Sequence, residues 1–143
     1  MPPEQFWQGV EQFNQQEFYD CHDTLEALWM EASEPEKRFY QGILQIAVAC
    51  YHLSNRNWRG AVILLGEGIA RLRDFQPIYE GVDVTGLLRQ SAELLKALQQ
   101  AGAENINEFA LALEGAGVAS GTAVCQLPKI QIVDSGETYV DAR

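Results

Sequence analysis

The chain has 143 residues, of which 47% are hydrophobic and 21% are charged. This length and composition predict one globular domain with its own core, and they exclude a disordered or fibrous chain. The 20 acidic and 10 basic residues give a formal net charge of −10. Because no local cluster of lysine or arginine offsets that charge, the chain repels phosphate backbones, and nucleic acid is excluded from the expected partners.

The expected compartment follows from the N-terminus, the hydropathy and the cysteines. The first residues, MPPEQFWQGVEQF, contain neither a basic start nor an apolar run, so we expect no signal peptide. The longest nearly apolar stretch, residues 43–51, is far shorter than the ~20 residues that cross a bilayer, so no membrane partner is expected. Three cysteines without a C-x-x-C pair indicate free thiols in a reducing compartment. We therefore expect a cytoplasmic protein.

Helix signals dominate the sequence from the N-terminus onward. A short helical turn is expected over residues 4–13, and a strong helical pattern covers residues 15–31. The stretch SEPE predicts the next helix start, because Ser33 and Glu36 have the spacing of a capping box. That helix is expected to span residues 34–54.

The helix over residues 34–54 carries no charged residue between Arg38 and Arg56, which is typical of a central, buried helix. Asn55 is expected to take the left-handed conformation that ends this helix. Asn57 then suits the N-cap of the following helix.

Three more elements are expected before the C-terminal tail. A helix is predicted over residues 58–74, and Gly68 on its apolar face predicts a close approach to another helix. Residues 76–83 are expected to form a loop, and Asp83 suits the N-cap of a helix that runs to about residue 100. A short helix is expected over residues 105–114.

Beyond Gly115 small residues give way to β-formers around Ile130 and Ile132. We expect residues 116–143 to be an extended segment laid over the helices, or a flexible tail. The predicted fold is therefore all-α, a compact antiparallel bundle of four to five helices in residues 1–115 with an extended C-terminal tail.

Two polar residues stand among the aromatic residues of FYDCHDTLEALW, residues 18–29. At about 100° per residue, His22 and Glu26 fall on the same side of a helix as Tyr19 and Trp29. We therefore expect the imidazole and the carboxylate to point inward with the aromatic side chains.

The helix over residues 34–54 also presents a line of polar groups, although it is nearly uncharged. Consecutive helices joined by a short turn pack antiparallel, so this line is expected to face His22 and Glu26. Its members are Arg38, Gln41, Gln45 and His52.

The facing polar lines leave two interpretations open. One is a buried hydrogen-bond network that fixes the register of the two helices, because a buried carboxylate needs partners. The other is a pocket between the helices, in which Glu26 acts as acid, base or ligand and His22 as its proton partner. His22 and Glu26 are then the candidate catalytic residues. The candidate ligand-pocket residues are Tyr19, Trp29, Arg38, Gln41, Gln45 and His52.

Motifs for metal and nucleotide binding are weaker signals than the two polar lines. Cys21–His22 and Cys50–His52 cannot close on one zinc ion, because the two members of each pair point about 100° and 200° apart on a helix. A site made of His22, Glu26 and His52 is geometrically compatible, but it lacks the Glu-x-x-His ligands of di-iron bundles. P-loop, G-x-S-x-G and G-x-G-x-x-G motifs are absent from the sequence. We assign no metal from the sequence, and any cofactor is unknown.

Three segments resemble the signature of a small helical family of bacteria and archaea, domain-of-unknown-function family 309: FNQQEFYDCHDTLEALW, RFYQGILQIAVACYHL and NWRGAVILLGEGIARL. The resemblance covers residues 13–75, and Asp23 departs from it where glutamate is commoner. It implies a compact bundle of antiparallel helices and no established activity. The matching positions are Phe13, Asn14, Phe18, His22, Asp23, Glu26, Trp29, Gln41, Gly42, Gln45, Ala47, His52, Asn57, Gly60 and Ala61.

Two functions are expected to compete. The first is binding of a small molecule, or minor hydrolytic chemistry, with Glu26 as proton acceptor and His22 as the group that orients it. The alternative is a non-catalytic module that binds a protein partner, in which the polar line only fixes helix register. A concave cavity over Glu26 favours the first function, and exposed apolar area favours the second. A homo-oligomer is compatible with both. The residues of the expected pocket are His22, Glu26, Gln41 and Gln45.

Overall fold

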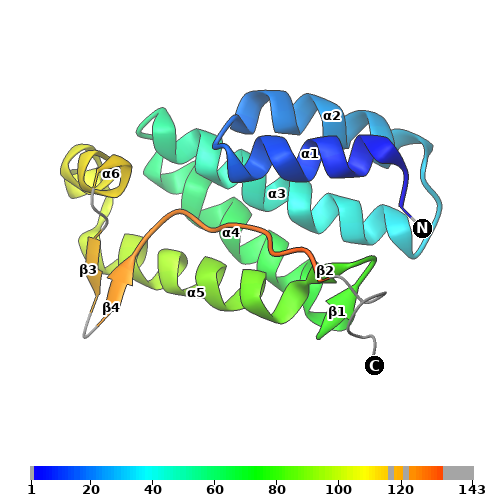
Figure 1. Ribbon diagram of the computed structural model, residues 1–143. Coiled ribbons are helices and arrows are strands. Elements are labelled where there is room, and N and C mark those ends of the chain that lie inside the picture. The colour runs from blue at the N-terminus through cyan, green and yellow to red at the C-terminus, as the bar shows by residue number, and fades with distance from the viewer. Residues whose placement is uncertain (1, 116–117, 121–122, 134–143) are drawn as a thin grey trace.

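The structure is a computed structural model that describes residues 2–115, 118–120 and 123–133. This part of the chain contains six α-helices, which confirms the predicted all-α class (Figure 1). Four to five helices were expected, and the additional one arises because the predicted short N-terminal turn is a complete helix. The bounds are α1 Glu4–Asn14, α2 Phe18–Glu31, α3 Glu36–Ser54, α4 Trp58–Leu72, α5 Val84–Ala101 and α6 Ile106–Glu114, with 3-10 turns η1 at Arg73–Phe75 and η2 at Ala103–Asn105.

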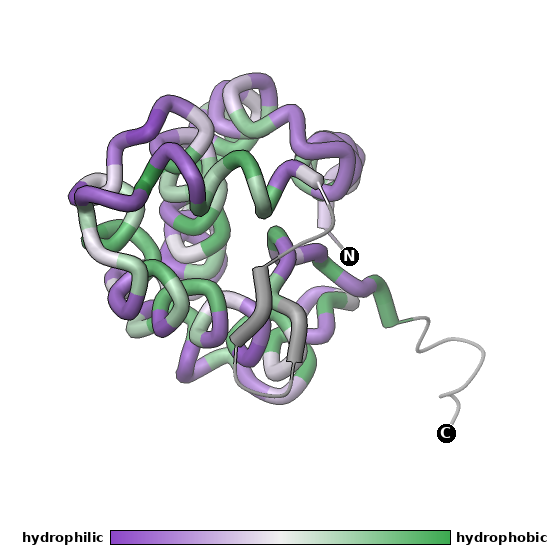
Figure 2. The backbone as a smooth tube through the Cα atoms, turned by 90° about the vertical axis from the view of Figure 1, so that its left-hand side faces the viewer, coloured by the Kyte–Doolittle hydropathy of each residue, from purple (hydrophilic) through white to green (hydrophobic). Residues whose placement is uncertain are grey.

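Consecutive helices pack on one another from α1 to α5. Figure 1 shows α1 and α2 on one side of the bundle, α5 on the other, and α3 and α4 between them. Hydrophobic and hydrophilic residues alternate along each helical coil (Figure 2), which is the pattern of helices that bury one face. No helix in the described ranges is both long and apolar enough to cross a membrane. Fully buried side chains from α1 to α5 form one core: Phe6, Phe13, Leu25, Phe39, Ile43, Ile46, Leu65, Leu72, Leu87, Leu94 and Leu98.

Two predicted N-caps are confirmed. The Asn57 Oδ1 atom accepts a hydrogen bond from the backbone N–H of Gly60 at 2.9 Å, and Asp83 Oδ1 accepts one from Gly86 at 2.9 Å. Each side chain satisfies a donor that the first turn of a helix leaves unpaired. These caps start α4 and α5.

Two predictions for the ends of α3 are wrong. Ser33 and Glu36 form no capping box, because the Glu36 carboxylate accepts a hydrogen bond from the Tyr79 hydroxyl at 3.0 Å instead. Asn55 has a φ of −93°, and its neighbour Arg56 takes the left-handed conformation at a φ of 61°.

Residues 76–83 contain a small hairpin, so the predicted loop is wrong there. Strand β1 (Ile78–Tyr79) pairs antiparallel with β2 (Val82–Asp83). The turn residues Glu80 and Gly81 have φ values of 50° and 78°. Positive φ at both turn residues is the requirement of a tight two-residue hairpin turn.

Residues 126–133, called the strap below, cross the bundle from β4 to β2 (Figure 1). They follow a second two-stranded sheet, in which β3 (Val118–Ser120) pairs antiparallel with β4 (Ala123–Cys125). The prediction for residues 116–143 also covers positions outside the described residues, namely 116–117, 121–122 and 134–143.

Two amide side chains hold the strap by its backbone. Asn14 Nδ2 donates to the carbonyl of Ile130 at 2.9 Å, and the N–H of Ile130 donates to Asn14 Oδ1 at 2.7 Å. Gln90 makes the same pair of bonds with Lys129, at 3.1 and 2.9 Å. The two amides thus satisfy backbone groups of the strap as a neighbouring strand would.

Candidate functional site

The buried face of α2 is centred away from His22 and Glu26. Its buried residues are Phe18, Cys21, Leu25 and Leu28. The His22 side chain is 32% exposed and the Glu26 side chain is 47% exposed, so the prediction that both point into the core is wrong. The physical reason is that α2 packs against two neighbours, α1 and α3. The centre of its buried face therefore points between these two helices, about 60–100° around the helix axis from His22. His22 and Glu26 are left at the edge of the buried face, next to α3.

A groove of about 230 Å³ lies at that margin, between α2, α3 and α4. Its lining contains five of the candidate site residues, three from α2 and two from α3. Apolar side chains from α3 and α4 complete the wall. The lining residues are His22, Glu26, Trp29, Gln41, Leu44, Gln45, Val48 and Leu64.

Three candidate pocket residues lie outside this groove. Tyr19 is 56% exposed and packs against Tyr51 toward the other end of the helix pair, with ring centroids 5.6 Å apart. Arg38 is exposed in the first turn of α3. His52 Nδ1 lies 3.3 Å from Asn57 Nδ2, because α4 begins beside the last turn of α3.

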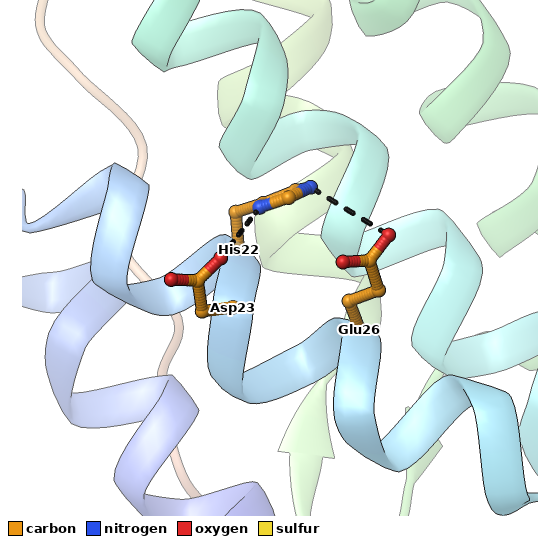
Figure 3. Close-up of side chains that lie close together, drawn as sticks. All are labelled: His22, Asp23 and Glu26. Carbon is orange, nitrogen blue, oxygen red and sulfur yellow. Dashed lines mark hydrogen bonds and ion pairs between the residues drawn. The ribbon is translucent and has the colours of Figure 1, made fainter.

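His22 has a carboxylate near each ring nitrogen (Figure 3). Asp23 Oδ1 lies 3.2 Å from His22 Nδ1, and Glu26 Oε2 lies 4.0 Å from His22 Nε2. One nitrogen and two carboxylate oxygens of this trio lie within 4.8 Å of one another, a donor set that could hold a divalent ion. All three side chains are open to solvent, where such groups often gather without an ion, so we assign no metal. His52, the third ligand considered from the sequence, is not part of the trio.

Two charged residues that the sequence reasoning missed fix the groove's walls. Lys37 Nζ lies 4.4 Å from the centroid of the Trp29 ring and donates to the Trp29 carbonyl at 2.8 Å. This lysine therefore caps the end of α2 and holds the indole by a cation–π contact. Glu67 of α4 accepts a hydrogen bond from Gln45 Nε2 at 3.2 Å. The position of Lys37, a few residues after the end of α2, could have predicted that it caps that helix. No local sequence signal indicates that Glu67 of α4 contacts Gln45.

Two residues that line the groove each carry a buried polar atom without a partner among the described residues. Trp29 Nε1, a donor, and Gln45 Oε1, an acceptor, are shielded from solvent and make no hydrogen bond in the part of the chain that the structure describes. Each unpaired buried group costs about 1–3 kcal/mol. The groove thus has a largely apolar lining and borders two buried hydrogen-bonding atoms that the described residues leave without a partner.

The cysteines offer no nucleophile. Cys21 and Cys50 are buried in the core, and Cys21 Sγ donates to the Gly9 carbonyl at 3.3 Å. Burial raises the pKa of Cys21 to about 12, and burial together with the neighbouring Cys21 raises the pKa of Cys50 further. Burial, followed by the charge of Glu93, also raises the pKa of Cys125. The thiols are therefore protonated at neutral pH, and the thiolate that attacks electrophiles is scarce.

This protonation predicts slow chemical modification. We expect the cysteines of the folded chain to resist 5,5′-dithiobis(2-nitrobenzoate) at neutral pH, because each thiol is both buried and protonated. The absorbance of released thionitrobenzoate measures the rate, and the same chain unfolded in urea provides the reference. A folded thiol that reacts as fast as the unfolded chain would contradict the expectation.

Fold and groove together define a class, a small helical-bundle protein with a groove between its second, third and fourth helices. Residues 6–64 match the family described as Domain of unknown function (DUF309), which confirms the resemblance seen in the sequence. This stretch contains every lining residue of the groove. The chain is also 33% identical over 84 residues to the uncharacterized protein YpuF of Bacillus subtilis (strain 168). That similarity covers 58% of this chain and 45% of YpuF, so the chain spans less than half the length of this relative.

Proposed function

We propose that the α2–α3 groove binds a small polar molecule. The observation that carries the proposal is the cavity itself, about 230 Å³ in volume, in which polar side chains of two helices converge over apolar residues of α3 and α4. A concave site with an apolar wall and a few convergent polar groups is the usual form of a small-molecule site. The volume lies below that of sites for drug-sized ligands, so the expected ligand is smaller.

The unfilled hydrogen-bonding groups indicate the ligand's chemistry. Trp29 Nε1 needs an acceptor and Gln45 Oε1 needs a donor. A small side-chain movement would expose both atoms to a molecule that carries the two functions, such as an amide or an amino alcohol. Pairing would recover part of the free energy that the unpaired groups now cost.

His22 and Glu26 supply acid–base chemistry to the same molecule. The 4.0 Å between His22 Nε2 and Glu26 Oε2 is too long for a direct hydrogen bond. A ligand hydroxyl or a water between them would contact both groups at about 2.8 Å. Glu26 would then accept its proton and His22 would orient it, which is the minimum arrangement for hydrolysis of a small substrate. We place this activity in the cytoplasm, as the free thiols indicate.

The alternative is a non-catalytic module that binds a protein partner, in which the polar line only fixes helix register, and its register-fixing network has less support than the pocket. Among the described residues no hydrogen bond joins His22 or Glu26 to Gln41 or Gln45. A register-fixing network needs such bonds between the two helices. The pocket interpretation requires only that these groups share one groove.

The indole N–H of Trp29 provides a direct test. Acetamide and ethanolamine, titrated separately into the full chain, are expected to move the Nε1–H resonance of Trp29 in a saturable way, because the proton gains an acceptor. Glu26→Gln is expected to weaken binding of ethanolamine about tenfold, as the loss of one charged hydrogen bond does. The same change should alter the free energy of unfolding by less than about 1 kcal/mol, since the carboxylate is 47% exposed.

Glu31→Gln is the matched control, because Glu31 is an exposed residue of α2 outside the groove. It is expected to bind both probes as the unmodified chain does. A Trp29 resonance that stays fixed with both probes, or equal weakening in the two variants, would reject the groove as a binding site.

A further inference from the structure

A second cavity, of about 330 Å³, lies where α2 begins and α3 ends. Residues of α6 and Leu127 of the strap close its other sides. The cavity is therefore assembled from segments that are far apart in the sequence. None of its lining residues belongs to the α2–α3 groove described above.

Much of this cavity's wall is apolar and aromatic. Tyr19 and Tyr51 lie side by side, with ring centroids 5.6 Å apart, and their side chains are 56% and 36% exposed. Large exposed rings next to a hollow are typical of a surface that binds another molecule. The apolar lining residues are Phe18, Tyr19, Cys50, Tyr51, Leu53, Ala110, Leu113 and Leu127.

The charged groups that line the cavity in the described part of the chain are acidic. Glu17, Asp20 and Glu114 line it, and no lysine or arginine among the described residues does. Arg56 Nη1 neutralises Glu114 at 2.9 Å from its Oε2 atom. Glu17 and Asp20 are exposed residues at the start of α2, and within the described residues no ion pair engages either carboxylate.

We propose that this cavity binds an organic cation with an apolar body, such as an arylalkylamine. The apolar body would lie against Phe18, Tyr19 and Tyr51, and the ammonium group would lie beside Glu17 and Asp20. The carboxylates of Glu17 and Asp20 favour a cation over a neutral molecule, because they attract positive charge and no ion pair among the described residues engages them. The volume suits a small molecule, at the lower end of known sites.

The cavity binds its ligand without covalent chemistry. Cys50 is the one thiol in its lining, and it is 1% exposed. A buried, protonated thiol does not attack a ligand. This inference also stands apart from the function proposed for the groove, because the two sites share no residue.

Three probes with one body and different charges test the proposal: 2-phenylethylammonium, 2-phenylethanol and phenylacetate. Each is titrated into the full chain and followed by backbone amide resonances. The ammonium is expected to bind about fivefold more tightly than the alcohol, with phenylacetate the weakest. The resonances that move should belong to the first turn of α2, the last turn of α3 and α6. Equal affinities, or shifts confined to the groove residues, would overturn the proposal.

Paired variants separate the cavity from the general charge of the chain. Glu17→Gln with Asp20→Asn is expected to weaken the ammonium about fivefold and to leave the alcohol unchanged. The control pair, Glu31→Gln with Asp74→Asn, also removes two negative charges, but at exposed positions outside the cavity. It should leave ammonium binding intact. Equal weakening by both pairs would show nonspecific attraction and overturn the proposal. The amide spectrum of each variant reports whether it is folded.

Discussion

Replacing Asn14 by alanine is expected to lower the free energy of unfolding by about 2–3 kcal/mol. The amide of Asn14 makes two hydrogen bonds to the backbone of Ile130, at 2.9 and 2.7 Å. Alanine removes both and leaves the N–H and the carbonyl of a buried residue without partners. Urea unfolding followed by circular dichroism measures the change.

The loss should be concentrated in the strap. Hydrogen exchange at the Ile130 amide is expected to become much faster in Asn14→Ala, because that amide loses its acceptor. Asn107→Ala is the control, since Asn107 is an exposed asparagine of α6. If both variants had the same stability and the same exchange rate at Ile130, the strap would not depend on the Asn14 amide.

Replacing Gly68 by alanine is expected to force α3 and α4 apart. A Cβ atom at this position would lie 2.7 Å from Ile46 Cγ1 and 2.9 Å from the backbone oxygen of Gly42. A side chain can rotate away, but the backbone of a neighbouring helix cannot move without disturbing the packing around it. Overpacking of this kind costs about 1–3 kcal/mol.

Gly66 provides a matched control on the same helix. A Cβ atom there would meet nothing within 4 Å. Gly66→Ala is therefore expected to stabilise the chain by about 0.5–1 kcal/mol through helix propensity alone. Because Gly68→Ala gains the same propensity, the difference in unfolding free energy between the two variants isolates the clash. Equal thermal and urea stability of the two variants would show that α3 and α4 are not in close contact at Gly68.

Local signals in the sequence determined the helices. The capping side chains of Asn57 and Asp83 predicted where α4 and α5 begin, and Gly68 predicted a close helix–helix contact. These signals are reliable because caps and helical periodicity depend on groups within about four residues of one another. The sequence also indicated that Gln41 and Gln45 share a face of α3, and both line the groove.

Other features depend on which surfaces meet, which no local pattern encodes. The helical wheel located the polar side of α2, but the packing of both α1 and α3 on this helix decided that His22 and Glu26 lie at its margin. Glu36 does not form the predicted capping box, because folding brings the Tyr79 hydroxyl within hydrogen-bond distance of its carboxylate. The second cavity needs α6 and the strap, whose lining residues are more than 50 positions from Tyr51 in the sequence.

The sequence by itself thus determined most of the helices and one polar line, since these arise from neighbours along the chain. Only the tertiary structure decided which polar groups are buried, which are shared between helices and where hollows remain. The physical reason is that burial is set by the combined surface of all packed elements. A residue at the edge of one helix becomes a core residue or a groove residue according to the partner that lies against it.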